Sequence, residues 1–135
     1  MKKENTKLLD LYKGFEGEDG YFFAAADKAN DFHYFIKSWE GYVCDIFYKE
    51  PHMMNGQWRG FTKLFQEFIQ DDIDYGLDNF YKITNKQELF DDINWYKKNR
   101  TYNKEAQLLL DSLIELIQCA IDNGYDILIA KDWDA

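Results

Sequence analysis

The amino-acid sequence predicts an all-α or nearly all-α domain in which about five amphipathic helices form one compact bundle. Three observations lead to this expectation. The 135 residues contain a single proline, so little in the chain would interrupt a helix. Apolar residues recur at three- and four-residue steps over most of its length. No repeat, low-complexity stretch or linker divides the chain, so residues 1–135 are expected to form a single helical domain.

The N-terminal half is expected to hold three of these helices. Asn5 or Thr6 would cap a short first helix, which ends at the glycine-rich acidic stretch 14–20. The stretch 21–23 reads either as a short strand or as the approach to the next helix. The second helix would begin between Ala25 and Asp31 and end before Pro51. Its apolar stripe is Phe32, Phe35, Ile36, Trp39, Val43, Ile46 and Phe47. The third helix would run from about Gln57 and bury Trp58, Phe61, Leu64, Phe65, Phe68 and Ile69.

Two further helices are expected in the C-terminal half. Thr84 followed by Gln87 fits a capping box for a helix that reaches about Arg100. The fifth helix would be capped near Asn103 and stopped by the Asn-Gly pair at 123–124. The apolar tail 125–130 is expected to form either a short strand or an extended arm.

An excess of acid is the main clue to function. Asp and Glu number 25 against 16 Lys and Arg, which gives a net charge of −9. Because 46% of the residues are hydrophobic, the chain can fold, and its excess acid is expected on the surface. The sequence has no basic stripe for nucleic acid, and its charge disfavours anionic membranes. With no apolar run long enough for a membrane span and no signal peptide, we expect a cytoplasmic protein.

No motif in the sequence indicates a metal, a cofactor or a catalytic activity. Cys44 and Cys119 are far apart without CxxC spacing, and His33 and His52 form no zinc-binding pair. The acids from Asp71 to Asp78 do not fit a calcium loop, because neither possible register places acid ligands at the required positions. We therefore expect a protein that is not an enzyme and binds neither metal nor cofactor.

Tyr and Trp residues beside acids are typical of a protein-binding face, in which the ring gives contact area and the carboxylate steers association. Two groups of residues fit this description. The first group of candidate partner-binding residues is Asp71, Asp72, Asp74, Tyr75 and Asp78, and the second is Asp91, Asp92 and Trp95. A solvated acidic edge that only keeps the protein soluble is the alternative interpretation.

In its size, acidity and lack of catalytic motifs, the chain resembles the immunity proteins of bacterial toxin–immunity pairs, including those of contact-dependent growth inhibition. The resemblance implies a cytoplasmic antidote that binds and neutralises a basic toxin domain such as a nuclease. Three alternatives stay open: a phage- or mobile-element-encoded inhibitor of a host nucleic-acid enzyme, a small enzyme using dispersed carboxylates, and a helical adaptor or homo-oligomer. Monomer and homodimer are both compatible with the sequence.

Overall fold

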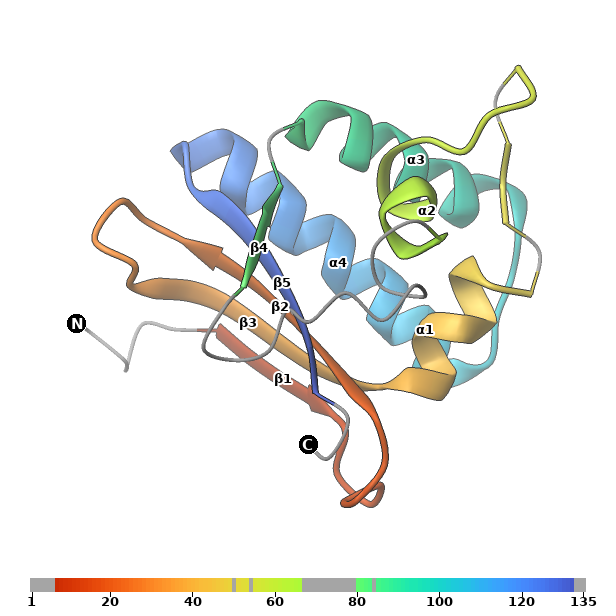
Figure 1. Ribbon diagram of the computed structural model, residues 1–135, viewed down its shortest axis with the longest axis horizontal. Helices are drawn as coiled ribbons and strands as arrows, with labels where there is room; N and C mark the ends of the chain where they lie inside the picture. The colour runs from red at the N-terminus through yellow and green to blue at the C-terminus, as the bar shows by residue number, and fades with distance from the viewer. Residues whose placement is uncertain (1–6, 50, 54, 67–79, 84, 133–135) are drawn as a thin grey trace.

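The protein has an α+β fold, and the expectation of an all-α bundle is wrong. The computed structural model describes residues 7–49, 51–53, 55–66, 80–83 and 85–132. Five strands form one mixed sheet, and helices cover one of its faces (Figure 1). The strands are β1 (Lys7–Leu11), β2 (Gly20–Ala26), β3 (Phe32–Trp39), β4 (Tyr81–Ile83) and β5 (Asp126–Asp132). The helices are α1 (Glu40–Phe47), α2 (Gly60–Leu64), α3 (Lys86–Asn99) and α4 (Lys104–Asn123).

The strand order across the sheet is β1-β3-β2-β5-β4. β1 runs parallel to β3, and the other neighbouring strands pair antiparallel. At the centre of the sheet, Phe23 of β2 lies opposite Ile36 of β3 on one side and Ile129 of β5 on the other. The C-terminal strand is therefore an inner strand of the sheet, although it comes last in the chain.

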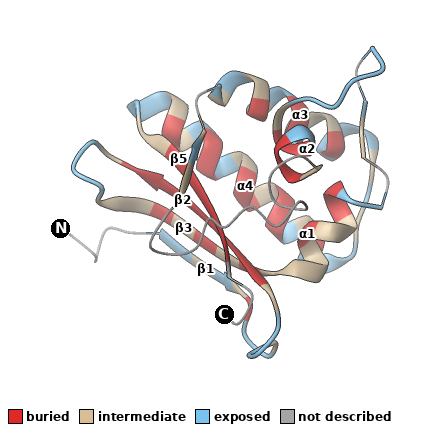
Figure 2. Ribbon diagram, in the orientation of Figure 1, coloured by how far each residue is buried: buried red, intermediate tan, exposed pale blue. Residues whose placement is uncertain are grey.

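Strand β2 is buried along its whole length, as Figure 2 shows. Phe23 and Ala25 point into the core beneath the helices, whereas Ala24 and Ala26 belong to a second apolar cluster with Leu128. A strand that is buried on both faces reads as a continuous apolar run without alternation. This explains why the stretch 21–23 was ambiguous in the sequence.

The main core lies between the sheet and the helices. Helices α1 and α4 contact the sheet, α3 packs against α4, and α2 packs against α3. Helix α4 contributes much of the buried surface, because Leu109, Leu113, Leu116 and Ile117 are each no more than 1% exposed. A sheet with one helical layer buries enough apolar area to stabilise a chain of this size without a disulfide or a structural metal.

The predicted long helix before Pro51 is half strand and half helix. Residues 32–39 form β3, and only the following eight residues form α1. Tyr34, Ile36 and Ser38 alternate toward the core, but Phe35 packs on the opposite face against Phe22. Aromatic residues on both faces of β3 produced a three-and-four spacing that imitates a helix. The predicted first helix is likewise wrong, because Lys7–Leu11 is the edge strand β1.

The two C-terminal helices are confirmed. The side chain of Asn103 caps α4 by accepting a hydrogen bond from the Ala106 amide, and Gly124 ends the helix in the left-handed conformation. For α3, the cap is the side chain of Asn85, which accepts from the Glu88 amide. Thr84, the predicted cap, lies outside the described residues. The tail forms strand β5, one of the two expected conformations.

Both cysteines are free and partly buried, Cys44 on α1 and Cys119 on α4. Burial, assisted by the nearby Glu40 carboxylate, raises the pKa of the Cys44 thiol to about 11. At about pH 8 only one thiol in roughly a thousand would be ionised, compared with about one in four for an ordinary cysteine. We expect Cys44 in the folded protein to react with iodoacetamide at least about a hundredfold more slowly than after unfolding in urea. Peptide mass spectrometry of timed samples measures both rates, and equal rates would contradict the burial of this thiol.

Candidate functional site

The structure separates the sequence-predicted binding residues. Asp71, Asp72, Asp74, Tyr75 and Asp78 lie outside the described residues. Asp91, Asp92 and Trp95 all belong to α3, but they differ in exposure. Asp91 is exposed and Trp95 is half-buried, whereas Asp92 is only 1% exposed. The Asp92 carboxylate therefore points into the protein and the Asp91 carboxylate points away from it.

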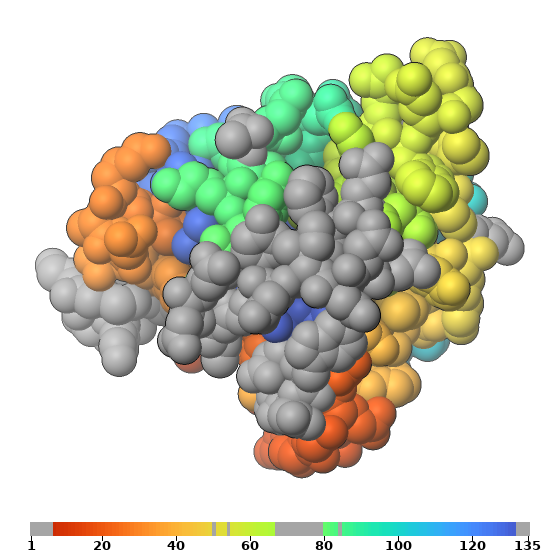
Figure 3. Space-filling model, in the orientation of Figure 1, coloured from red at the N-terminus to blue at the C-terminus, as the bar shows by residue number. Residues whose placement is uncertain are grey.

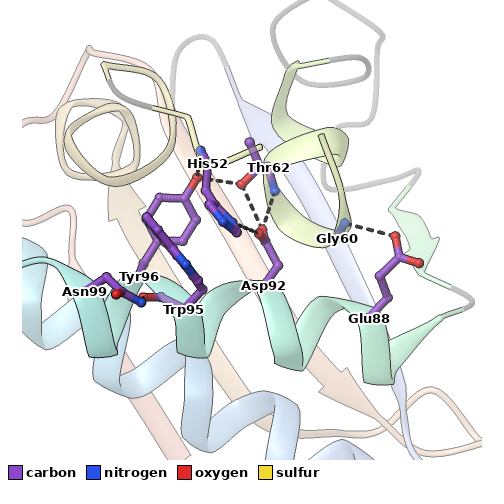
Figure 4. Close-up of polar contacts among 8 residues, drawn as sticks. All are labelled: His52, Gly60, Thr62, Glu88, Asp92, Trp95, Tyr96 and Asn99. Atoms are coloured by element: carbon purple, nitrogen blue, oxygen red, sulfur yellow. Dashed lines mark hydrogen bonds and ion pairs between the residues drawn. The ribbon is translucent and has the colours of Figure 1, made fainter. Parts of the chain in front are cut away.

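Asp92 is the centre of a buried polar cluster, shown in Figure 4. Its Oδ2 accepts hydrogen bonds from the Thr62 amide at 2.9 Å and from the Thr62 hydroxyl at 2.8 Å. The Thr62 hydroxyl also lies 2.6 Å from the Tyr96 hydroxyl. These contacts attach α2 to α3. We call His52, Thr62, Asp92 and Tyr96 the Asp92 cluster.

His52 connects a third segment to this cluster. Its backbone amide donates to the Tyr96 hydroxyl at 2.8 Å, and its ring stacks on Trp95 with 3.6 Å between ring centroids. His52 Nδ1 lies 3.5 Å from Asp92 Oδ1. Both of these atoms are buried, and neither has a hydrogen-bond partner among the described residues. The segment around His52 is thereby held against α3 by its backbone and by its ring.

Four-residue spacing along α3 explains how one helix makes these contacts. Glu88, Asp92 and Tyr96 fall on one face of the helix. Glu88 Oε1 accepts from the Gly60 amide at 3.1 Å, so α2 is held at its first residue as well as at Thr62. The four-residue spacing is visible in the sequence, but Asp92 was placed in one predicted binding group with Asp91 because the two are adjacent. The partners Thr62 and His52 come from far away in the chain and had no local signal.

Burial controls the charge of the cluster. It raises the pKa of Asp92, and the hydrogen bonds from Thr62 and the contact with His52 offset this only in part. Burial also raises the pKa of Tyr96. The hydroxyl of Tyr96 is consequently protonated over the whole physiological range and is available as a donor.

The segment around His52 belongs to the connecting loop between α1 and α2, by which we mean residues 48, 49, 51–53 and 55–59. This loop projects from the molecule (Figure 3). It carries three of the five large apolar side chains that are exposed in the described parts of the chain: Tyr48, Met53 and Trp58. Trp58 had been expected in the core but is 37% exposed. The loop thus presents aromatic and apolar surface that its own fold does not cover.

Two neighbouring hollows lie beside the connecting loop. One, of about 570 Å³, is lined by residues that include Met53, Trp58 and Glu88. The other, of about 400 Å³, is lined by Asp91, Asp92 and Glu88 together with Arg59 and several amide side chains. Trp58 and Met53 of the loop therefore lie on the same side of the molecule as the acids of α3.

The Asp92–His52 pair has little access to solvent. A carboxylate facing an imidazole is the arrangement of a general base. Here the His52 side chain is only 11% exposed and its ring stacks on Trp95. Within the described ranges, no group of three acidic, His or Cys side chains could hold a metal ion. None of the helices in these ranges is long and apolar enough to cross a bilayer.

Comparisons of the chain with protein-family models, with curated proteins and with solved structures find no match.

Proposed function

We propose that this protein is an acidic antidote that binds a basic protein domain, such as a nucleic-acid-cutting toxin, in the cytoplasm and blocks it. The observation that carries the proposal is the connecting loop. Met53 is 51% exposed and Trp58 is 37% exposed, yet a buried polar cluster fixes the base of this loop. A loop that presents Trp and Met to solvent from an anchored base is typical of a binding hot spot, because the anchor reduces the entropy lost when a partner covers the loop.

The charge of the chain supports a basic partner. Residues 67–79, which follow α2 in the sequence, contain five acids and no Lys or Arg: Glu67, Asp71, Asp72, Asp74 and Asp78. More than half of the net charge of −9 thus comes from 13 consecutive residues. Asp91 adds an exposed carboxylate beside the loop. Such a concentration of negative charge speeds association with a positive cleft and weakens as salt is added.

A phage- or mobile-element-encoded inhibitor of a host nucleic-acid enzyme would use the same surface. The two functions differ in the origin of the partner: a toxin in the first case and a host enzyme in the second. Identification of the bound protein by mass spectrometry distinguishes them.

Substitution of Trp58 tests the role of the loop. We expect tagged protein to capture a basic partner from lysate of the source organism at about 50 mM salt and to capture less at about 500 mM, where charges are strongly screened. Trp58→Ala should weaken that capture at least about thirtyfold, because truncation of a Trp anchor costs about 2 kcal/mol or more. Titration of the purified partner by calorimetry measures the loss.

Leu108→Ala is the matched control. The exposed fraction of Leu108, 43%, is similar to the 37% of Trp58, but Leu108 lies on α4 outside the connecting loop. Its removal should leave the affinity unchanged. If both variants bind as tightly as the wild-type protein, the loop is not the binding surface.

A further inference from the structure

A hollow with three carboxylates in its wall lies beside α3. The acidic hollow, as we call the space of about 400 Å³ described above, is lined by Glu88, Asp91 and Asp92. Glu88 and Asp92 project from the same side of the helix (Figure 4), and Asp91, three residues after Glu88, is also a neighbour of Glu88. Asp91 is exposed, whereas Asp92 is only 1% exposed. Asp91 therefore lies at the mouth of the hollow and Asp92 at its inner end.

No lysine or arginine of the described ranges neutralises these three acids. None of the ion pairs there joins Glu88, Asp91 or Asp92 to a Lys or Arg side chain. Arg59 borders the hollow, but its Nη2 contacts the side-chain oxygen of Gln57, at 3.5 Å. Since three acids outnumber this one arginine, the hollow attracts a positive group from outside the chain.

The inner end of the hollow holds an unsatisfied acceptor. The amide and the hydroxyl of Thr62 both donate to Oδ2 of Asp92. Oδ1 is buried without a hydrogen-bond partner among the described residues, and His52 Nδ1 is 3.5 Å away from it. Burial raises the pKa of Asp92, so the fold compensates the negative charge of this carboxylate only in part. A positively charged donor at Oδ1 would satisfy the oxygen and stabilise the ionised form.

The walls of the hollow suit a planar organic cation better than a metal ion. The side chains of Asn55, Asn85 and Gln87 add neutral hydrogen-bonding groups to the three carboxylates. A guanidinium group has five N–H donors in one plane, so it can use acceptors that are spread over a wall. A metal ion needs its ligands around one point, and no group of three acidic, His or Cys side chains in the described ranges could hold one. The hollow therefore matches an arginine side chain.

We propose that the acidic hollow is the docking site for an arginine side chain of the basic partner. The guanidinium bonds to the carboxylates of Asp91 and Glu88 near the mouth and to Oδ1 of Asp92 at the inner end. The neighbouring hollow shares Glu88 and exposes Trp58 and Met53, so it receives apolar surface beside that arginine. Arg and Trp are both enriched in binding hot spots. This assignment rests on the proposed function, because the partner supplies the arginine.

Three small compounds test the hollow without the partner: N-acetyl-arginine amide, N-acetyl-lysine amide and N-acetyl-citrulline amide, which has the shape of the arginine compound but no charge. In an NMR titration, the side-chain NH₂ signals of Asn55, Asn85 and Gln87 report from the walls. We expect the arginine compound to shift these signals with a dissociation constant on the order of 1 mM at low salt. The lysine compound should bind at least about threefold more weakly, because its ammonium is a point charge. Unmoved signals with the arginine compound, or equal binding of either other compound, would overturn the proposal.

Asp91→Asn tests the mouth of the hollow and should weaken binding of the arginine compound about threefold, as expected for an exposed charge pair. Asp122→Asn is the matched control. Asp122 is exposed on α4 and accepts from Gln118 at 2.8 Å, just as Asp91 accepts from Gln87 at 3.0 Å, but it does not line the hollow. The control should keep the wild-type affinity. Equal losses in the two variants would show that only net charge matters and would overturn the site.

Asp92→Asn tests the inner end. With its side-chain oxygen accepting from Thr62, the asparagine places an NH₂ group where Oδ1 stood, and this donor opposes the guanidinium. Binding of the arginine compound should fall at least about tenfold, the loss of a hydrogen bond to a charged group. If Asp92→Asn does not fold, Asp91→Asn still decides the outcome.

The compounds also separate the arginine site from the antidote function. If the arginine compound does not bind but a partner is captured through Trp58, the arginine site is wrong and the antidote function stands. If the compound binds as described and no partner is captured, the site stands and the antidote function loses its support.

Discussion

Gly60→Ala is expected to destabilise the protein by about 3 kcal/mol or more. Gly60 begins α2 with φ of +55°, a conformation that side chains disfavour. An added Cβ would lie 2.6 Å from the Cβ of Asp92 and 2.7 Å from the backbone oxygen of Glu88. Since helix backbone cannot move aside easily, α2 and α3 would be forced apart where Thr62 bonds to Asp92. Urea unfolding followed by circular dichroism gives the change in free energy.

Gly56→Ala separates the steric effect from the backbone effect. Gly56 also has a positive φ, +77°, but an added Cβ would meet nothing within 4 Å. This variant should lose only about 1 kcal/mol, the cost of the left-handed conformation. Equal losses in the two variants would show that the close approach of α2 to α3 is not needed for stability.

Asp92→Ala should cost about 3 kcal/mol, a loss similar in size to that of Gly60→Ala. The substitution leaves the amide and the hydroxyl of Thr62 without an acceptor in a buried position, and it removes the partner of His52. Asp92→Asn keeps an acceptor for Thr62 and should cost less than about 1 kcal/mol at pH 8. Chemical denaturation of both variants at the same pH measures the difference.

The pH dependence of this difference has a definite sign. Because the pKa of Asp92 is raised in the folded protein, protonation of this carboxyl contributes stability at low pH, and the contribution is lost as pH rises through the raised value. The wild-type protein should therefore lose stability relative to Asp92→Asn as pH increases.

Asp91→Ala is the control for the Asp92 variants. It should lower the free energy of unfolding by no more than about 0.5 kcal/mol, because Asp91 is exposed. A large loss at Asp91 and none at Asp92 would contradict the placement of these two acids.

The sequence was sufficient for the elements that carry local signals. Helix α4 has an Asn cap, a regular apolar stripe and an Asn-Gly stop, and all three are present in the structure. The sheet was missed because its central strands lack the alternation that identifies a strand. β2 is buried on both faces, and the aromatic residues on both faces of β3 imitate helical spacing. The edge strand β1 has only five residues, too few to establish a period.

The candidate site was predictable only in part. The sequence indicated α3 through Asp91, Asp92 and Trp95. The residues adjacent to the two acids gave no indication that Asp91 faces water and Asp92 faces the core. The contacts of Asp92 come from Thr62 and His52, which are 30 and 40 residues away in the chain. Such contacts depend on the tertiary arrangement. Trp58 was assigned to the core because hydrophobicity alone cannot distinguish a buried aromatic residue from an exposed one.

Inhibition of the captured partner is the most direct test of the proposed antidote function. The basic protein obtained at low salt would be assayed for its own activity, nucleic-acid cleavage in the case of a toxin, while this protein is added in increasing amounts. The antidote function predicts that activity disappears at about one molar equivalent under tight-binding conditions. A saturated complex that keeps full activity would contradict it, because the protein would then bind its partner without blocking it.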